Sequence, residues 1–520
     1  MRIRGYEKNK PIVGVIDWLI IASAVVQLIF SVLSVVFDDY GICEIIFFNL
    51  YVLWALLICF TVFNNLNRHF LLFAFYACFF IFLMGQKVVK YIEGEPFYNT
   101  LTFVLTTLSP RQYVTFNNSM YLSLLFSYVG YRLFRRYRLP SDKQMEIPRL
   151  NPYEQVNRKN NIFILKVLTV ATFACAVAMQ LMIVIAKKDL SYTEGYTVNV
   201  DVPTILKIGN YLFMGAVLLL LSCNPTKWER ITALLMFFVV QGGVQLLQGR
   251  RIMVAQTALF IVWYAFTFSK AYKREFKYIN LVKIILLGVF LMLIFYFVEA
   301  SRSDSASGGK GIFAMLRDFI VSTGGSDSTI ANVIDKGDLF PKSAIEHVFS
   351  PLKEAFTNNA VFKKVLSLFG VATSESVGQG VEYLKQTDSF EHWLSYIVSP
   401  ELYVSGHGMG SSYVAEVWFV SGLGGVAVTG LCLGAIIGRI STVNLQSKKI
   451  YLSAIALFFA YKLTGFPRSG IFSWLSDFIY LMASMSLFKV FSYLFNFPPR
   501  VVKRGNVAEQ TPAVEGGGNE

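Results

Sequence analysis

The chain has 520 residues, of which 55% are hydrophobic and 15% are charged, and its mean hydropathy is +0.52. Soluble domains carry about 25% charged residues, so the composition excludes an ordinary soluble enzyme and predicts a polytopic membrane protein. The net charge of +14 does not indicate a nucleic-acid partner, because the cations gather in alternate loops between apolar runs.

Apolar runs long enough to cross a bilayer recur along the chain, and we expect about twelve transmembrane helices in an all-α fold. Residues 96–116 are expected to form an interfacial or re-entrant piece, and residues 496–520 a disordered cytoplasmic tail. The predicted spans are 12–36, 42–63, 70–89, 118–135, 162–186, 203–223, 231–248, 252–269, 281–298, 412–438, 450–466 and 470–495.

Lysines and arginines divide the loops into two sets. The loops on the side of the N-terminus carry far more of them than the short loops opposite. The positive-inside rule therefore predicts that both termini are cytoplasmic. Four regions follow from this topology: nine helices with short loops in 1–298, a large extracytoplasmic loop in 299–411, three helices in 412–495 and the tail.

The loop at 299–411 differs from all the others in its length. It contains three of the four histidines, His347, His392 and His407. Its amphipathic stretches lead us to expect a small, mostly helical cap on the outer membrane surface. Those stretches are residues 312–321, 360–370 and 390–398.

Arginines occur on the side where the positive-inside rule disfavours them. Arg250 and Arg251 occupy a hairpin between two spans. Arg302 follows the ninth span, and Arg468 lies in another hairpin near the end of the chain. One alternative is that each guanidinium reaches a lipid phosphate or pairs with a local acid such as Glu299. The other is that the four arginines together form an anion site. A planar guanidinium matches phosphate oxygens in pairs, so the second alternative predicts a diphosphate site at the outer mouth.

The segment that follows the loop carries a second set of candidate residues. His407 is either a general base or a loop histidine without a role. Glu416 lies about one turn inside the apolar zone. It contacts a sugar hydroxyl, holds an arginine, or forms a structural ion pair within the bundle. Glycines farther along this span predict close helix packing. The aromatic residues near the segment are expected either to stack on sugars or to anchor the interface; they are Trp393, Tyr396, Tyr403 and Tyr413.

These features together resemble the Wzy-type O-antigen and oligosaccharide repeat-unit polymerases, which are related to the O-antigen ligases. The resemblance covers the architecture of nearly the whole chain. Its local motifs are Gly249–Arg251, Arg302, the large loop, a glycine-rich entry from Gly408 to Gly425, and Arg468–Gly470.

The resemblance implies a GT-C-like fold and a metal-independent, inverting glycosyltransferase without a cofactor. It implies undecaprenyl-pyrophosphate-linked oligosaccharides as donor and acceptor, membrane lipid and a chain-length regulator as partners, and the periplasmic face of the bacterial inner membrane as the place of reaction. Two alternatives stay open: a ligase that transfers the glycan to lipid A core or protein, and a flippase of lipid-linked sugars.

The resemblance also suggests a role for each candidate residue. The arginines would bind the pyrophosphate, and His407 and Glu416 would be catalytic. Ligases and many polymerases carry a His-Asn pair where this chain has two serines, so the identity of the base stays open. The arginines are Arg250, Arg251, Arg302 and Arg468, and the weaker candidates for contacts with the glycan are Glu299, Ser411, Ser412 and Tyr413.

Overall fold

The computed structural model describes most of the chain. The described residues contain helices and no β-strand, as the all-α prediction requires. Eight of their helices are long and apolar enough to cross a membrane, and two further apolar helices are shorter. The predicted count of about twelve spans stays a prediction, because span 281–298 lies almost wholly outside the described residues. These are residues 10–96, 108–135, 152–188, 190, 198, 200–248, 251–271, 288, 312–357, 379–443 and 449–496.

The expected interfacial piece at 96–116 lies mostly outside the described residues, and its last residues belong to α5. Residues 97–107 lie outside the described residues, and residues 110–116 form the first turns of α5. The side chain of Ser109 accepts a hydrogen bond from the Gln112 backbone, the Gln112 side chain accepts one from Ser109, and proline follows at the first helical position. The first helices are α1 (Lys10–Phe37), α2 (Tyr40–Phe63), α3 (Leu66–Leu83), α4 (Gly85–Ile92) and α5 (Pro110–Phe134).

The predicted span 70–89 is broken at Met84, where α3 ends and the short α4 begins. The predicted span 231–248 is continuous but contains a π-helical segment in its second half. The helices of the middle region are α6 (Pro152–Ala186), α8 (Thr204–Ser222), α9 (Lys227–Phe238), the π-helix η3 (Val239–Val244), α10 (Gln245–Leu247) and α11 (Arg251–Ala271).

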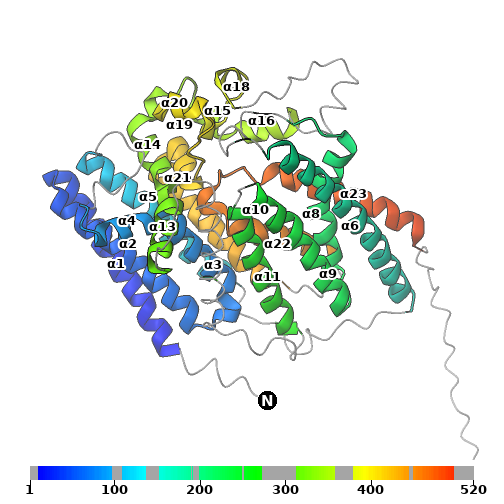
Figure 1. Ribbon diagram of the computed structural model, residues 1–520. Coiled ribbons are helices and arrows are strands. Elements are labelled where there is room, and N and C mark those ends of the chain that lie inside the picture. The colour runs from blue at the N-terminus through cyan, green and yellow to red at the C-terminus, as the bar shows by residue number, and fades with distance from the viewer. Residues whose placement is uncertain are drawn as a thin grey trace, which may run out of the picture.

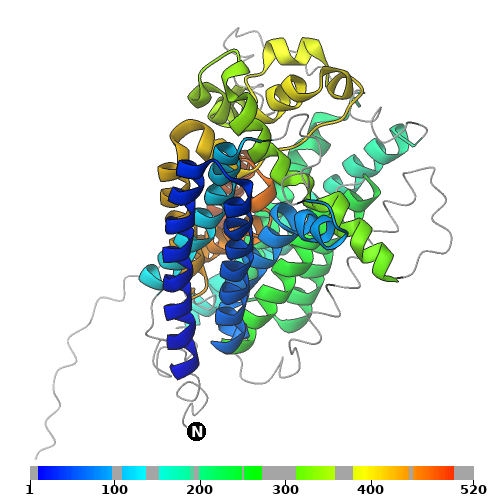
Figure 2. The same cartoon turned by 90° about the vertical axis from the view of Figure 1, so that its left-hand side faces the viewer.

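The described part of the large loop is helical, as expected. Most of it forms a cap at one end of the bundle, whereas α13 runs alongside the bundle against α3 and α4 (Figures 1 and 2). The expected amphipathic stretch at 360–370 lies outside the described residues. The elements are α13 (Ile312–Thr323), η4 (Gly324–Asp327), α14 (Ser328–Lys336), η5 (Gly337–Leu339), α15 (Ala344–Val348), α16 (Ser350–Thr357), α18 (Val381–Gln386), α19 (Phe390–Val398) and α20 (Pro400–Val404).

The predicted close packing of the glycine-rich span is confirmed by its contact with α5. A Cβ atom on Gly434 would lie 1.9 Å from the carbonyl oxygen of Ser127, and one on Gly130 would lie 2.1 Å from that of Leu431. The two backbones therefore touch, and α5 fixes the position of the helix that leaves the cap. The last elements are α21 (Tyr413–Ile440), α22 (Ile450–Leu463), η6 (Phe466–Arg468) and α23 (Leu475–Phe495).

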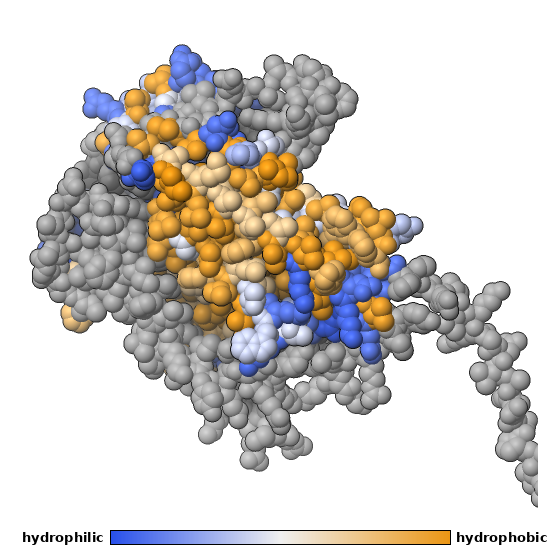
Figure 3. Space-filling view, turned by 45° about the vertical axis from the view of Figure 1, so that its right-hand side comes forward, coloured by the Kyte–Doolittle hydropathy of each residue, from blue (hydrophilic) through white to orange (hydrophobic). Residues whose placement is uncertain are grey.

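An apolar band crosses the side of the bundle that is drawn in Figure 3. Figure 3 shows this band with hydrophilic residues along its borders. The first helix, α1, begins at the end of the bundle opposite the cap (Figure 2). The band and the spanning helices identify a membrane protein with its cap outside the apolar layer.

Candidate active site beneath the cap

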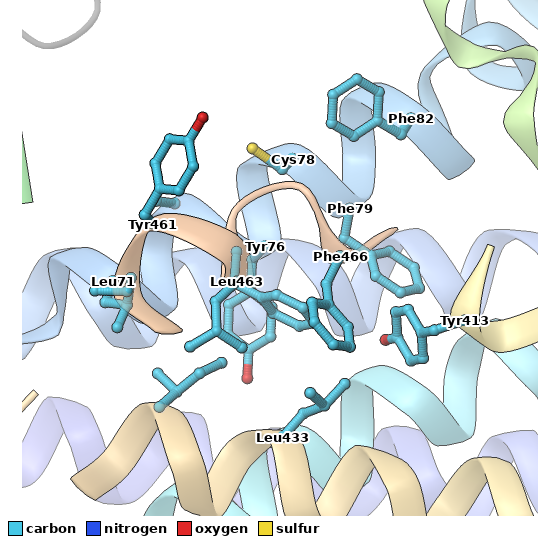
Figure 4. Close-up of a cluster of buried hydrophobic side chains, with 14 of the residues drawn as sticks. Leu71, Tyr76, Cys78, Phe79, Phe82, Tyr413, Leu433, Tyr461, Leu463 and Phe466 are labelled. Carbon is cyan, nitrogen blue, oxygen red and sulfur yellow. The ribbon is translucent and has the colours of Figure 1, made fainter. Parts of the chain in front are cut away.

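The segment between α22 and α23, residues 464–474, forms a hairpin that enters the bundle from the capped end. We call it the α22–α23 hairpin. Its Phe466 is 5% exposed and lies between α3 and α21, with its ring 5.9 Å from that of Tyr413 (Figure 4). Burial of this ring fixes the depth of the hairpin in the apolar core.

Two glycines hold the hairpin against helices on either side. A Cβ atom on Gly465 would lie 1.3 Å from the side-chain nitrogen of Gln256 on α11. A Cβ atom on Gly470 would lie 2.4 Å from Oε1 of Glu416 on α21. A larger residue at Gly470 would displace the buried carboxyl group of Glu416, so the two glycines let the hairpin lie close to α11 and α21.

Glu416 connects the hairpin to the segment that leaves the cap. Its side chain is buried, and its two oxygens bind different partners. Oε1 accepts a hydrogen bond from Ser411 Oγ at 2.6 Å, and Oε2 accepts one from the backbone N–H of Ile471 at 2.8 Å. Both donors are neutral. Among the described residues Glu416 therefore has no ion pair, and its catalytic role stays a prediction.

Arg468 is exposed at the tip of this hairpin, and its backbone N–H donates to the carbonyl oxygen of Gly465 at 3.1 Å. The first residue of α11 is Arg251. It precedes Gln256 by five positions, which corresponds to about 8 Å along the helix axis. Because Gln256 contacts Gly465, the start of α11 and the Arg468 turn lie at the same end of the bundle.

Several predicted site residues lie outside this description. Arg250, Arg302 and Glu299 are not among the described residues, and only the backbone of Arg251 is. Their roles therefore stay predictions.

His407 lies in the exposed loop between α20 and α21. The Ser405 hydroxyl donates to the carbonyl oxygen of Leu402 at 2.9 Å, which uses its single hydrogen. The 3.0 Å contact between Ser405 Oγ and His407 Nδ1 is then an N–H donating from the imidazole. In the neutral ring this leaves Nε2 as the atom that can accept a proton.

Two of the predicted aromatic contacts are closed to a glycan. Tyr413 is fully buried, and its hydroxyl shares a hydrogen bond with Ser123. Tyr403 is also buried. Trp393 and Tyr396 are half-buried, so only these two have ring surface that a sugar can reach.

The serines that precede α21 differ in their contacts. Ser411 is occupied by Glu416. The hydroxyl of Ser412 is buried and has no hydrogen-bond partner within the described part of the chain. Such a group costs free energy unless a ligand or water satisfies it, which makes Ser412 the serine with spare bonding capacity.

Aromatic contacts attach the cap to this end of the bundle. Phe419 of α21 packs against Phe340 and Phe390 of the cap, with ring centroids 4.7 and 5.8 Å apart. Phe349 of the cap packs against Phe472 of the hairpin at 4.7 Å. The cap therefore covers both the start of α21 and the hairpin.

A buried ion pair was not predicted from the sequence, where Lys87 is one cation in a short loop. Its Nζ lies 3.6 Å from Oδ2 of Asp327 and 3.4 Å from the ring centroid of Phe116. Both charged side chains are 1% exposed. No local pattern marks this pair, because its members belong to distant elements, α4 and η4.

A comparison with known proteins identifies the family. The profile of the O-antigen polysaccharide polymerase Wzy family matches residues 19–495, nearly the whole chain. The chain belongs to this family. No curated protein and no solved structure matches it. As a member of the Wzy family it is a membrane-bound, glycosyltransferase-type polymerase, and the family implies lipid-linked oligosaccharide substrates.

Proposed function

We propose that this Wzy polymerase joins oligosaccharide repeat units carried on undecaprenyl pyrophosphate, at the capped face of the bacterial inner membrane. In this proposal the termini are cytoplasmic, the bundle has about twelve spans in a GT-C-like fold, and the regions 1–298, 299–411 and 412–495 keep their predicted roles. The proposal is supported by the position of the α22–α23 hairpin, which carries Arg468 and lies between α11 and α21. It lies at the same end of the bundle as Arg251, the first residue of α11.

The proposed reaction needs an anion site at this place. The anomeric C–O bond of the growing glycan breaks, its electrons stay with the pyrophosphate, and a hydroxyl of the next lipid-linked unit bonds to the anomeric carbon. Direct displacement inverts that carbon, and no metal is required if protein cations stabilise the charge on the departing phosphate. The proposed cations are Arg250, Arg251, Arg302 and Arg468.

A base must take the proton of the attacking hydroxyl. Nε2 of His407 is the proposed acceptor, because Nδ1–H is already bonded to Ser405. Glu416 is proposed to hold the hairpin and Ser411 in place. Ser412 is as buried as Tyr413, so Glu299 is the proposed contact with the glycan.

An assay of the purified chain in vesicles tests the proposal. Lipid-linked repeat units are supplied as the sole substrate, and the products are separated by length. The proposal predicts a ladder of longer lipid-linked glycans. Transfer only after lipid A core or a protein acceptor is added would indicate a ligase, and movement of unchanged units across the membrane would indicate a flippase; either result contradicts the proposal.

A further inference from the structure

A groove runs along the outside of the bundle between α1 and α5, at the end away from the cap. Its volume is about 470 Å³. Ile20, Ala24 and Leu28 of α1 line one wall at intervals of four residues, and Leu125 and Val129 of α5 line the other. Residues four apart share one face of a helix, so each helix presents a single apolar stripe to the groove.

The two helices are held at a fixed separation beside the groove. The hydroxyl of Ser23 lies 2.9 Å from that of Tyr121, and the side-chain nitrogen of Gln27 donates to Asn118 at 2.8 Å. These bonds join α1 to α5 on its bundle side. The side chain of Ala24 is too small to close the space that remains on the membrane side, so the groove stays open.

The length of the groove matches one leaflet of a bilayer. From Asp17 to Leu28 the helix rises about 16 Å, which is about half of the 30 Å hydrocarbon core. Trp18, next to Asp17, is 72% exposed on the surface of the bundle. Exposed tryptophans gather where the hydrocarbon meets the headgroups, so this end of the groove lies at headgroup depth and Leu28 near the bilayer midplane.

The headgroup end of the groove carries one charge of each sign. Arg132 Nη2 lies 3.0 Å from Asp17 Oδ2, and the hydroxyl of Tyr128 also donates to Asp17. The side chains of Arg132 and Asp17 remain 32% and 30% exposed. A guanidinium binds phosphate oxygens and a carboxylate binds an ammonium group. The pair is therefore complementary to a headgroup that holds phosphate and a primary amine together.

We propose that this groove binds one phospholipid with an ethanolamine headgroup, from the leaflet away from the cap. One acyl chain lies between the apolar stripes of α1 and α5. The phosphate contacts Arg132, and the ammonium group contacts Asp17. The site is separate from the hairpin and does not depend on the proposed reaction.

Native mass spectrometry tests this binding with the full chain. The protein is reconstituted with equal amounts of phosphatidylethanolamine and phosphatidylglycerol, extracted, and stripped stepwise of lipid with detergent. We expect one phosphatidylethanolamine to stay bound to each chain after the other lipids are removed. Its retention should exceed that of phosphatidylglycerol about tenfold, which corresponds to the free energy of one charge-assisted hydrogen bond. Equal retention of both lipids, retention of neither, or a dimer that displaces lipid from α1 would overturn the proposal.

Three variants locate the binding. Asp17→Asn should bring the preference between the two lipids close to one, because the ammonium group loses its partner. Ala24→Trp should fill the groove and remove the retained lipid. The matched control is Val32→Trp, on the same helix at a position that is 55% exposed and outside the groove, and it should retain the lipid. If Ala24→Trp retains as much phosphatidylethanolamine as the control, the proposal is wrong. If Ala24→Trp does not fold, the preference of the wild type for phosphatidylethanolamine over phosphatidylglycerol tests the proposal.

Discussion

Two acidic side chains are buried where the cap joins the bundle, and they are satisfied in different ways. Glu416 accepts hydrogen bonds from two neutral donors, Ser411 and the Ile471 backbone. Asp327 faces the cation Lys87, whose Nζ lies 3.6 Å from its Oδ2. The first group therefore holds the shape of the α22–α23 hairpin, whereas the second attaches η4 of the cap to α4.

The two buried acids should therefore respond differently to substitution. A buried ion pair contributes little net stability, but the loss of one partner is costly because the other charge stays buried. Changes at Lys87 should therefore act on folding, and changes around the hairpin should act on catalysis.

The largest effect is expected from Lys87→Met, which leaves Asp327 buried without its cation. We expect a loss of about 3–5 kcal/mol in unfolding free energy, measured as a lower thermal midpoint of the detergent-solubilised protein. The double variant Lys87→Met/Asp327→Leu should recover most of the loss. A single variant as stable as the wild type would remove the distinction between the two sites.

Arg251→Ala and Arg302→Ala should act in the opposite way. We expect chain extension to slow by a factor on the order of 10²–10³, because each removes a cation from the departing diphosphate, while the thermal midpoint and membrane insertion stay unchanged. Arg439→Ala, at an exposed position near the far end of α21, is the matched control. Full activity of either variant in the vesicle assay would count against the proposed site.

Substitutions at Glu416 separate positioning from catalysis. Glu416→Ala leaves the Ile471 N–H and the Ser411 hydroxyl without an acceptor, a cost of about 1–3 kcal/mol for each buried group, and we expect a tenfold to hundredfold slower reaction. Glu416→Gln keeps one acceptor oxygen, and the Ser411 hydroxyl can turn to accept from the amide, so most activity should remain. Equal and complete loss in both variants would show that the carboxylate itself reacts.

The smallest expected effect concerns the pH dependence of the cap. Burial lowers the pKa of His347, whose Nδ1 is 2.7 Å from the carbonyl oxygen of Asp388. When folding lowers the pKa of a histidine, the free energy of unfolding does not depend on this group above the unfolded pKa of about 6.5. Below that pH the unfolded chain binds the proton more readily, and the free energy of unfolding falls by at most 1.4 kcal/mol per pH unit.

His347→Phe should flatten the fall in thermal midpoint between pH 7.5 and pH 5.5. The pKa of His392 is also lowered by burial, so this variant should keep a smaller residual slope. A slope as steep as that of the wild type would exclude His347 as the titrating group.

Much of the fold could be predicted because a long apolar run in a membrane is stable as an α-helix, which satisfies its own backbone hydrogen bonds. Helix α19 coincides with its predicted amphipathic stretch 390–398. The start of α5 was placed too late because Asn117 and Asn118 interrupt its apolar pattern. Their partners lie within α5 or on α1, which a hydropathy pattern does not show.

Less of the candidate site could be predicted. The sequence indicates His407, Glu416 and Arg468 as separate candidates, because a histidine, an acid and an arginine are unusual at the edge of an apolar run. It does not show that Gly465 touches Gln256, because contacts between helices depend on tertiary packing.

A binding measurement tests the proposed diphosphate site most directly. The purified chain is titrated with undecaprenyl pyrophosphate and with undecaprenyl monophosphate, and the same titrations are made with Arg251→Ala, Arg302→Ala and Arg468→Ala. We predict that the wild type binds the diphosphate at least tenfold more tightly than the monophosphate, and that each variant loses this preference. Equal affinity for the two lipids in the wild type, or an unchanged preference in all three variants, would contradict it.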